Sequence, residues 1–214
     1  MAWPVPSARR PRLGRPPERS KLSLPTFTLL AYGGLAAVSF GASAALGRNP
    51  LEREAWLPTS GLEAALASMV LGLAVAALTL LGTRHAARAR WARAIGEELH
   101  PLVRGRSEHG LVLMALSSGV GEELFFRGLL SPWVGVVLSS LAFGVVHQIR
   151  GPGRVGWMVS AALLGLAFAL VFGATGSLVG PIVGHVLVNY VNLRGLRQGP
   201  VEARPLGGLL GRRR

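Results

Sequence analysis

Apolar residues gather in long blocks along this chain, separated by short polar segments. Four of the blocks are clean, and each is close to the roughly 20 residues that a helix needs to cross a bilayer. Two more are less clean, because one contains charged residues and the other is short. The pattern predicts six membrane-spanning helices, at about residues 26–47, 61–82, 111–130, 133–147, 155–173 and 176–193.

The composition supports a membrane protein. Hydrophobic residues make up 50% of the chain and charged residues only 15%, whereas soluble domains average about 25% charged residues. The first apolar block is longer than the core of a secretory signal, so we expect it to stay in the chain as an anchor. Cysteine is absent, which excludes disulfides, a cysteine nucleophile and thiolate metal ligands. The expected fold is an all-α polytopic membrane helix bundle.

Basic residues are distributed unevenly between alternate loops. With the N-terminus in the cytoplasm, 20 of the 23 lie inside, Arg48 and Arg53 lie outside, and Arg127 lies within a span. The positive-inside rule predicts this asymmetry, so we expect both termini in the cytoplasm. The net charge of +13 then reflects loops that hold the topology and contact anionic lipid. Nucleic acid is not expected as a partner.

The polar segments also suggest how the chain is organised. Both ends are basic and poor in apolar residues, so we expect them to be disordered. Two spans precede a basic central segment, which is expected to be a loop or an interfacial helix, and a core of four spans follows it. The five parts are residues 1–25, 26–82, 83–108, 109–195 and 196–214.

The central basic segment has a helical pattern of its own. Ala87, Trp91, Ile95 and Leu99 recur every fourth residue, which is typical of an amphipathic helix on a membrane surface, although a solvated helix fits as well. Its Gly-Glu-Glu-Leu at residues 96–99 repeats the first letters of a motif in the third span, and we expect this copy to be solvated. The histidines in or beside this segment, namely His85, His100 and His109, are expected to be ordinary surface residues.

Charged residues occur inside the third apolar block. Glu122 and Glu123 are followed by Arg127, and each such charge costs roughly 2.5 to 3.5 kcal/mol near the centre of a membrane helix. Residues four apart share a helix face, so Glu123 is expected to pair with Arg127 while Glu122 points elsewhere. The pair could simply lock a helix, but Glu122 would remain free for chemistry.

Two later blocks add further polar groups. His147 ends the fourth block one turn after Phe143, while His185 and Asn189 share one face of the last block. Singly, each group has an ordinary structural explanation, such as a hydrogen bond between helices. Together with the charged triplet they are nearly all the strongly polar groups in this part of the chain. Imidazole and carboxamide groups in a dry bundle can orient a reacting oxygen or donate to an oxyanion.

The order Glu-Glu-x-x-x-Arg, Phe-x-x-x-His, His-x-x-x-Asn resembles the CAAX-processing and bacteriocin-processing (CPBP) intramembrane endopeptidases, relatives of the type II CAAX prenyl endopeptidase. The match covers about residues 110–194 and includes every motif position. The resemblance implies a multi-pass membrane protease, expected in the cell membrane, that cleaves a membrane-anchored peptide or protein with or without a lipid.

The resemblance also implies a role for each residue. Glu122 would activate water with the help of His147, while His185 and Asn189 would stabilise the oxyanion. Glu123 and its arginine partner would shape the site. The residues themselves agree with this scheme, because a carboxylate in a low-dielectric cavity is a competent base near neutral pH.

Three alternatives stay open. The first is a metal: the residues favour a site without metal or other cofactor, but Zn²⁺ on Glu122, His147 and His185 is the competing arrangement. The second is a non-catalytic immunity or scaffold protein of the same fold. The third is a proton-coupled carrier that uses the same buried carboxylates. A carrier would be favoured by inverted repeats, and the two halves share no motif.

Overall fold

The computed structural model describes residues 23–199, and nearly all of them are helical. This range contains seven α-helices, one π-helical segment and no strand, apart from an isolated bridge between Glu52 and Ser177. The all-α fold is therefore confirmed. The elements are α1 (Leu24–Ala45), α2 (Gly61–Ala86), α3 (Arg90–Val103), α4 (Glu108–Glu123), η1 (Leu124–Leu130), α5 (Ser131–Val146), α6 (Arg154–Thr175) and α7 (Val179–Gln198).

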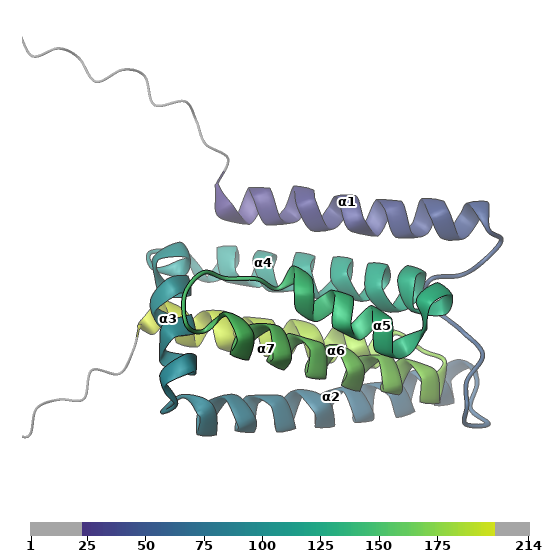
Figure 1. The fold of residues 1–214 in the computed structure, drawn as a ribbon. Helices are drawn as coiled ribbons and strands as arrows, with labels where there is room; N and C mark the ends of the chain where they lie inside the picture. The colour runs from purple at the N-terminus through teal and green to yellow at the C-terminus, as the bar shows by residue number, and fades with distance from the viewer. Residues whose placement is uncertain (1–22, 200–214) are drawn as a thin grey trace, which may run out of the picture.

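The long helices lie side by side as one bundle, and the short α3 lies across one end of it (Figure 1). The start of α1 and the end of α7 both lie at this α3 end. Each of the six predicted apolar blocks corresponds to a helical run. The arginines of α3 and of the neighbouring helix ends gather here, while Arg48 and Arg53 lie in the loop at the opposite end. The location of this end in the cytoplasm stays a prediction.

Four helical stretches are long and apolar enough to span a membrane, namely Leu24–Ala45, Gly61–Ala86, Glu108–Val146 and Arg154–Thr175. The 39-residue third stretch contains two predicted spans, because α4, η1 and α5 follow one another without a polar break. At Gly135 the backbone leaves the helical conformation, with φ 83° and ψ 163°. Glycine adopts this positive φ at low cost. Beyond it the chain turns back along the bundle, so six crossings remain the predicted count.

The ends of the bundle lie close to the predicted limits. Ser23 caps α1 by accepting a hydrogen bond from the Thr26 amide. The last helix continues to Gln198, past the end of the predicted span at 193, and Arg197 in its last turn binds Glu108 across 2.5 Å. The rest of the two predicted disordered tails lies outside the described residues.

Glycines bring α7 close to α2. A Cβ at Gly180 would lie 1.8 Å from the Ser68 carbonyl oxygen, and a Cβ at Gly184 would lie 2.5 Å from the Gly72 carbonyl oxygen. Ser68 also donates to the Ser177 carbonyl oxygen at 2.7 Å. These contacts show that small residues let the two helix backbones approach closely here. They fix α7 so that His185 faces α4.

The loop between α1 and α2 covers the end of the bundle opposite α3. The amides of Arg53 and Trp56 donate to the carbonyl oxygens of Gly176 and Gly173, at 2.9 and 3.0 Å. The Trp56 ring lies so close to Gly173 that a Cβ there would be 2.4 Å from it. Beneath this loop Leu178 is fully buried. We call residues 46–60 the end loop.

Candidate active site

The two glutamates of the motif occupy the last positions of α4, at the junction with η1. Both are buried, with 5% of Glu122 and none of Glu123 exposed. In the wide turn of η1 the Phe126 carbonyl oxygen accepts from the Ser131 amide five residues on and from Ser139 Oγ at 2.8 Å. Such π segments are rare and often occur at functional sites. This one begins directly after the glutamate pair.

Arg127 pairs with Glu123, the contact that their four-residue spacing predicts. Its Nη1 lies 3.0 Å from Glu123 Oε1, and both side chains are buried. The guanidinium also lies over the Phe143 ring, 4.3 Å from its centroid. Gly165 makes room for this arrangement, since a Cβ there would lie 2.8 Å from Arg127 Nη2. The positive charge is therefore held between a carboxylate and an aromatic face.

His185 joins both glutamates from α7. Its Nδ1 donates to Glu123 Oε1 at 2.7 Å, and its Nε2 lies 3.5 Å from Glu122 Oε2. The imidazole is buried and stacks on Phe168. The carboxylate at Nδ1 sets the ring orientation and leaves Nε2 directed at Glu122.

His147 approaches the same glutamate from the end of α5. Its Nδ1 donates to the Phe143 carbonyl oxygen at 2.7 Å, so Nε2 carries the lone pair of the neutral ring. That Nε2 lies 3.7 Å from Glu122 Oε2. With 21% of its side chain exposed, His147 connects the buried cluster to the surface.

One oxygen of Glu122 thus faces two imidazole nitrogens without bonding to either. Separations of 3.5 and 3.7 Å are longer than good hydrogen bonds, so this oxygen keeps its capacity to accept a proton or a hydrogen bond. Within residues 23–199, Glu122 Oε2 has no hydrogen-bond partner. Glu123 Oε2 and both terminal nitrogens of Arg127 also lack a hydrogen-bond partner in this range. Such atoms are uncommon in buried sites, and a catalytic role is one of their explanations.

Asn189 lies one turn beyond His185 on α7 and is half-buried. Its Nδ2 donates to Ser118 Oγ at 2.9 Å, one turn before Glu122 on α4. The structure therefore brings together five predicted residues through direct contacts within 4 Å and attaches Asn189 through Ser118. Glu97 and Glu98 are exposed on α3, away from this cluster, as the sequence predicts.

Two residues beside the cluster were not singled out by the sequence. Ser118 could have been identified from the sequence, because it places a hydroxyl group one helical turn before Glu122 in an apolar block. No pattern in the sequence connects Tyr32, on α1, with the site. Its phenol lies near the Glu122 carboxylate, and its Cβ would be 2.8 Å from a Cβ at Gly121.

A metal site can be assessed from the same geometry. Within the described range, no group of three or more His, Cys, Asp or Glu side chains is arranged to hold a metal ion. The three residues of the Zn²⁺ alternative, Glu122, His147 and His185, nevertheless converge on one carboxylate oxygen. Metal dependence is therefore a question for a chelator experiment.

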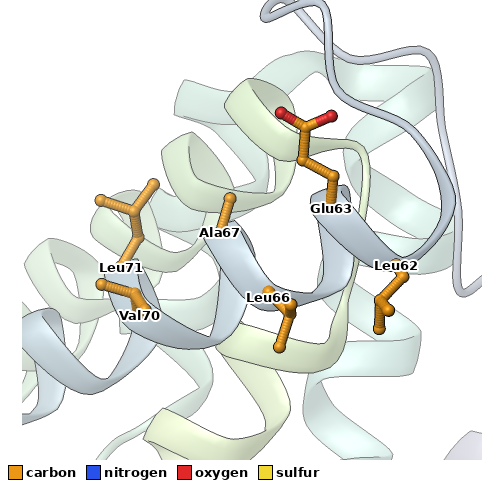
Figure 2. Close-up of a pocket in the computed structure, with 6 residues that line it drawn as sticks. All are labelled: Leu62, Glu63, Leu66, Ala67, Val70 and Leu71. Atoms are coloured by element: carbon orange, nitrogen blue, oxygen red, sulfur yellow. The ribbon is translucent and has the colours of Figure 1, made fainter.

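Two surface hollows lie outside the cluster. One of about 680 Å³ lies on the outer face of α2, and none of the motif residues lines it (Figure 2). Its lining consists of Leu62, Glu63, Leu66, Ala67, Val70 and Leu71. A second, of about 830 Å³, lies between α3 and the segment that follows His147. It is lined by Glu98, Leu99, Leu102, Gln148, Ile149, Arg150, Gly151 and Arg154.

Comparison with protein families identifies the segment that carries this site. Residues 109–191 match the family model described as type II CAAX prenyl endopeptidase Rce1-like. We call these matched residues the Rce1-like domain. This domain holds all six motif residues, whereas Tyr32 and the end loop lie outside it. The Rce1-like family is a protease family, which supports a peptidase role and a membrane-associated protein substrate. The comparisons with curated proteins and with solved structures found no match.

Proposed function

We propose that this chain is an intramembrane endopeptidase in which Glu122 activates water to hydrolyse a peptide bond of a membrane-associated peptide or protein. The observation that carries the proposal is the position of Glu122 Oε2. It is buried, has no hydrogen-bond partner among residues 23–199, and lies 3.5 and 3.7 Å from the Nε2 atoms of His185 and His147. A carboxylate in such surroundings is a competent general base.

In the proposed reaction, water between Glu122 and His147 gives a proton to Glu122 while its oxygen bonds to the substrate carbonyl carbon. Glu122 then passes that proton to the amide nitrogen as the carbon–nitrogen bond breaks. One water is consumed, and a carboxylic acid and an amine are released. His147 orients the water, because its Nδ1 is held by the Phe143 carbonyl oxygen and its Nε2 is left as an acceptor.

The oxyanion of the tetrahedral intermediate is stabilised by His185 and Asn189. Glu123 accepts a hydrogen bond from His185 Nδ1, which orients the ring so that its Nε2 faces the reacting groups. Arg127 balances the charge of Glu123. A preorganised donor of this kind typically contributes about 3 to 4 kcal/mol to the rate.

The membrane setting follows from the same proposal. The arginine-rich α3 end faces the cytoplasm and anionic lipid at the cell membrane, since that orientation obeys the positive-inside rule. The substrate is a membrane-anchored peptide, with or without a lipid. Nucleic acid is not among the proposed partners, because topology and lipid contact account for the basic charge.

The test is cleavage of a panel of membrane-anchored peptides by purified protein in liposomes. Each peptide is supplied with and without a lipid anchor, with and without a chelator, and products are identified by mass spectrometry. We expect cleavage by the natural protein, loss of cleavage in Glu122→Gln, and no effect of the chelator. Loss with chelator that Zn²⁺ restores would favour the metal arrangement. Equal cleavage by Glu122→Gln would refute the mechanism.

A further inference from the structure

A second contact joins α4 and α7 one helical turn from the buried charges. Ser118 precedes Glu122 by four residues, and Asn189 follows His185 by four, so the members of each pair share a helix face. The two antiparallel helices therefore meet at two levels. At one level His185 bonds to Glu123, and at the other Asn189 Nδ2 donates to Ser118 Oγ at 2.9 Å.

The two helices approach closely at the second level. A Cβ at Gly119 would lie 2.6 Å from Val186 Cγ2 and 3.0 Å from the Val186 amide nitrogen. Only glycine fits against the facing helix at this distance. The short Ser118 and Asn189 side chains can meet because the backbones are this near.

The hydrogen-bond pattern of Ser118 determines which end of the Asn189 carboxamide it faces. Ser118 Oγ donates to the Met114 carbonyl oxygen at 2.8 Å. A hydroxyl has a single hydrogen, so towards Asn189 this oxygen can only accept. The side-chain amide must present its NH₂ group there. A reversed amide would bring two acceptor oxygens together in a buried place, where Ser118 is only 9% exposed.

We propose that Ser118 is a positioning residue that fixes the amide of Asn189 in the orientation that oxyanion stabilisation requires. Ser118 uses one N–H of Asn189, and the second N–H, rather than the carbonyl oxygen, is offered to the reacting oxygen. This inference rests on the proposed function, because it assigns Ser118 a purpose only if Asn189 contacts the oxyanion. Ser118 itself does not contact the substrate.

The experiment compares Ser118→Ala, Asn189→Ala and the double variant with the natural protein in liposomes. The substrate is a membrane-anchored peptide that the natural protein cleaves. Loss of an oxyanion donor costs about 10²- to 10³-fold in kcat, and we expect that loss in Asn189→Ala. In Ser118→Ala the amide can turn over, so kcat should fall about tenfold, with KM and melting temperature unchanged. The double variant should be as slow as Asn189→Ala, because Ser118 acts only through Asn189.

Two further variants sharpen the comparison. Ser117 also donates to the Met114 carbonyl oxygen, at 3.2 Å, but Asn189 donates to Ser118 and not to Ser117. Ser117→Ala should therefore keep the natural kcat. Ser118→Thr retains the accepting oxygen and should recover most of the rate lost in Ser118→Ala.

The outcomes separate this inference from the function on which it rests. A natural kcat in Ser118→Ala, or a double variant slowed by the product of the two single losses, would overturn the role of Ser118. So would lower activity in both Ser118→Ala and Ser118→Thr accompanied by a lower melting temperature, which would indicate a structural role alone. Natural rates in both Asn189→Ala and Glu122→Gln would instead remove the proposed function.

Discussion

His185 donates a hydrogen bond from Nδ1 to Glu123 Oε1 across 2.7 Å and so links α7 to α4 in the interior of the bundle. The same carboxylate oxygen lies 3.0 Å from Arg127 Nη1. Glu123 Oε1 therefore lies against an imidazole and a guanidinium, whereas Glu122 Oε2, like the second oxygen of Glu123, has no hydrogen-bond partner among residues 23–199. Two adjacent residues of one type thus have different surroundings, which suits one for support and the other for moving protons.

The first prediction concerns Glu122→Gln. Glutamine keeps the shape of the side chain but cannot accept a proton, so kcat should fall by about 10² to 10⁴ while the protein stays folded. Glu97→Gln is the matched control, because Glu97 is exposed on α3. It should keep the natural rate and melting temperature, since surface substitutions usually stay within about 0.5 kcal/mol. A folded but inactive Glu97→Gln would indicate that the chemistry depends on Glu97 and Glu98 instead of Glu122 and Glu123.

The second prediction concerns Glu123→Gln, which should affect folding as well as rate. The change leaves Arg127 buried without a charged partner, and losing one member of a buried pair typically costs about 3 to 5 kcal/mol. We expect a lower melting temperature in detergent and a lower yield, together with lost activity. A melting temperature equal to that of Glu122→Gln would contradict the supporting role of Glu123.

The third prediction concerns Tyr32, which reaches the site from α1, outside the Rce1-like domain. Tyr32→Phe removes only the hydroxyl that approaches Glu122. A hydrogen bond to a charged group is typically worth about 1.5 to 3 kcal/mol, so kcat should fall by at least about tenfold with the fold intact.

The second tyrosine of the chain provides the control for that measurement. Tyr190 donates to Glu108 at the α3 end of the bundle. Tyr190→Phe should therefore lower stability slightly and leave kcat unchanged. Equal kcat values for Tyr32→Phe and the natural protein would show that α1 contributes no group to the reaction.

The fourth prediction concerns topology and is checked with reporter fusions. Fusions after Arg53, Arg104, Arg150 and Arg214 should report outside, inside, inside and inside, because basic loops stay in the cytoplasm. The structure agrees in one respect, since the start of α1 and the end of α7 lie at the same end of the bundle (Figure 1). A cytoplasmic reporter after Arg53 would overturn the predicted orientation.

The fifth prediction concerns the contact between α2 and α7. Gly180→Ala would place a Cβ 1.8 Å from the Ser68 carbonyl oxygen, so the helices must separate. Such overpacking typically costs about 1 to 3 kcal/mol or more, and melting temperature and activity should both fall. Gly82→Ala, where a Cβ has no neighbour within 4 Å, should be neutral. Normal stability in Gly180→Ala would mean that the close approach is not needed.

Local patterns in the sequence predicted much of this structure. The apolar blocks predicted the long helices, because a membrane helix needs an unbroken run of apolar residues. The four-residue spacing gave the Glu123–Arg127 pair. Both depend only on residues that are near one another in the chain.

Contacts between distant helices could not be predicted in the same way. Nothing in the sequence near Tyr32 indicates that α1 passes Glu122. The place of the reversal was only approximate, since the sequence puts the break between residues 130 and 133 and the backbone leaves the helical conformation at Gly135. Ser118 is intermediate: its position one turn before Glu122 was visible, but its partner on α7 was not.

The end loop has a consequence for the membrane as a barrier. A buried site that consumes water and moves protons would act as a leak if it opened on both faces of the bilayer. Hydrogen bonds from Arg53 and Trp56 to the α6–α7 turn hold this loop across one end, while His147 is exposed on the other side of the cluster. Under the proposed function, water is therefore drawn from a single compartment, and peptide hydrolysis proceeds without dissipating the ion gradients that the membrane maintains.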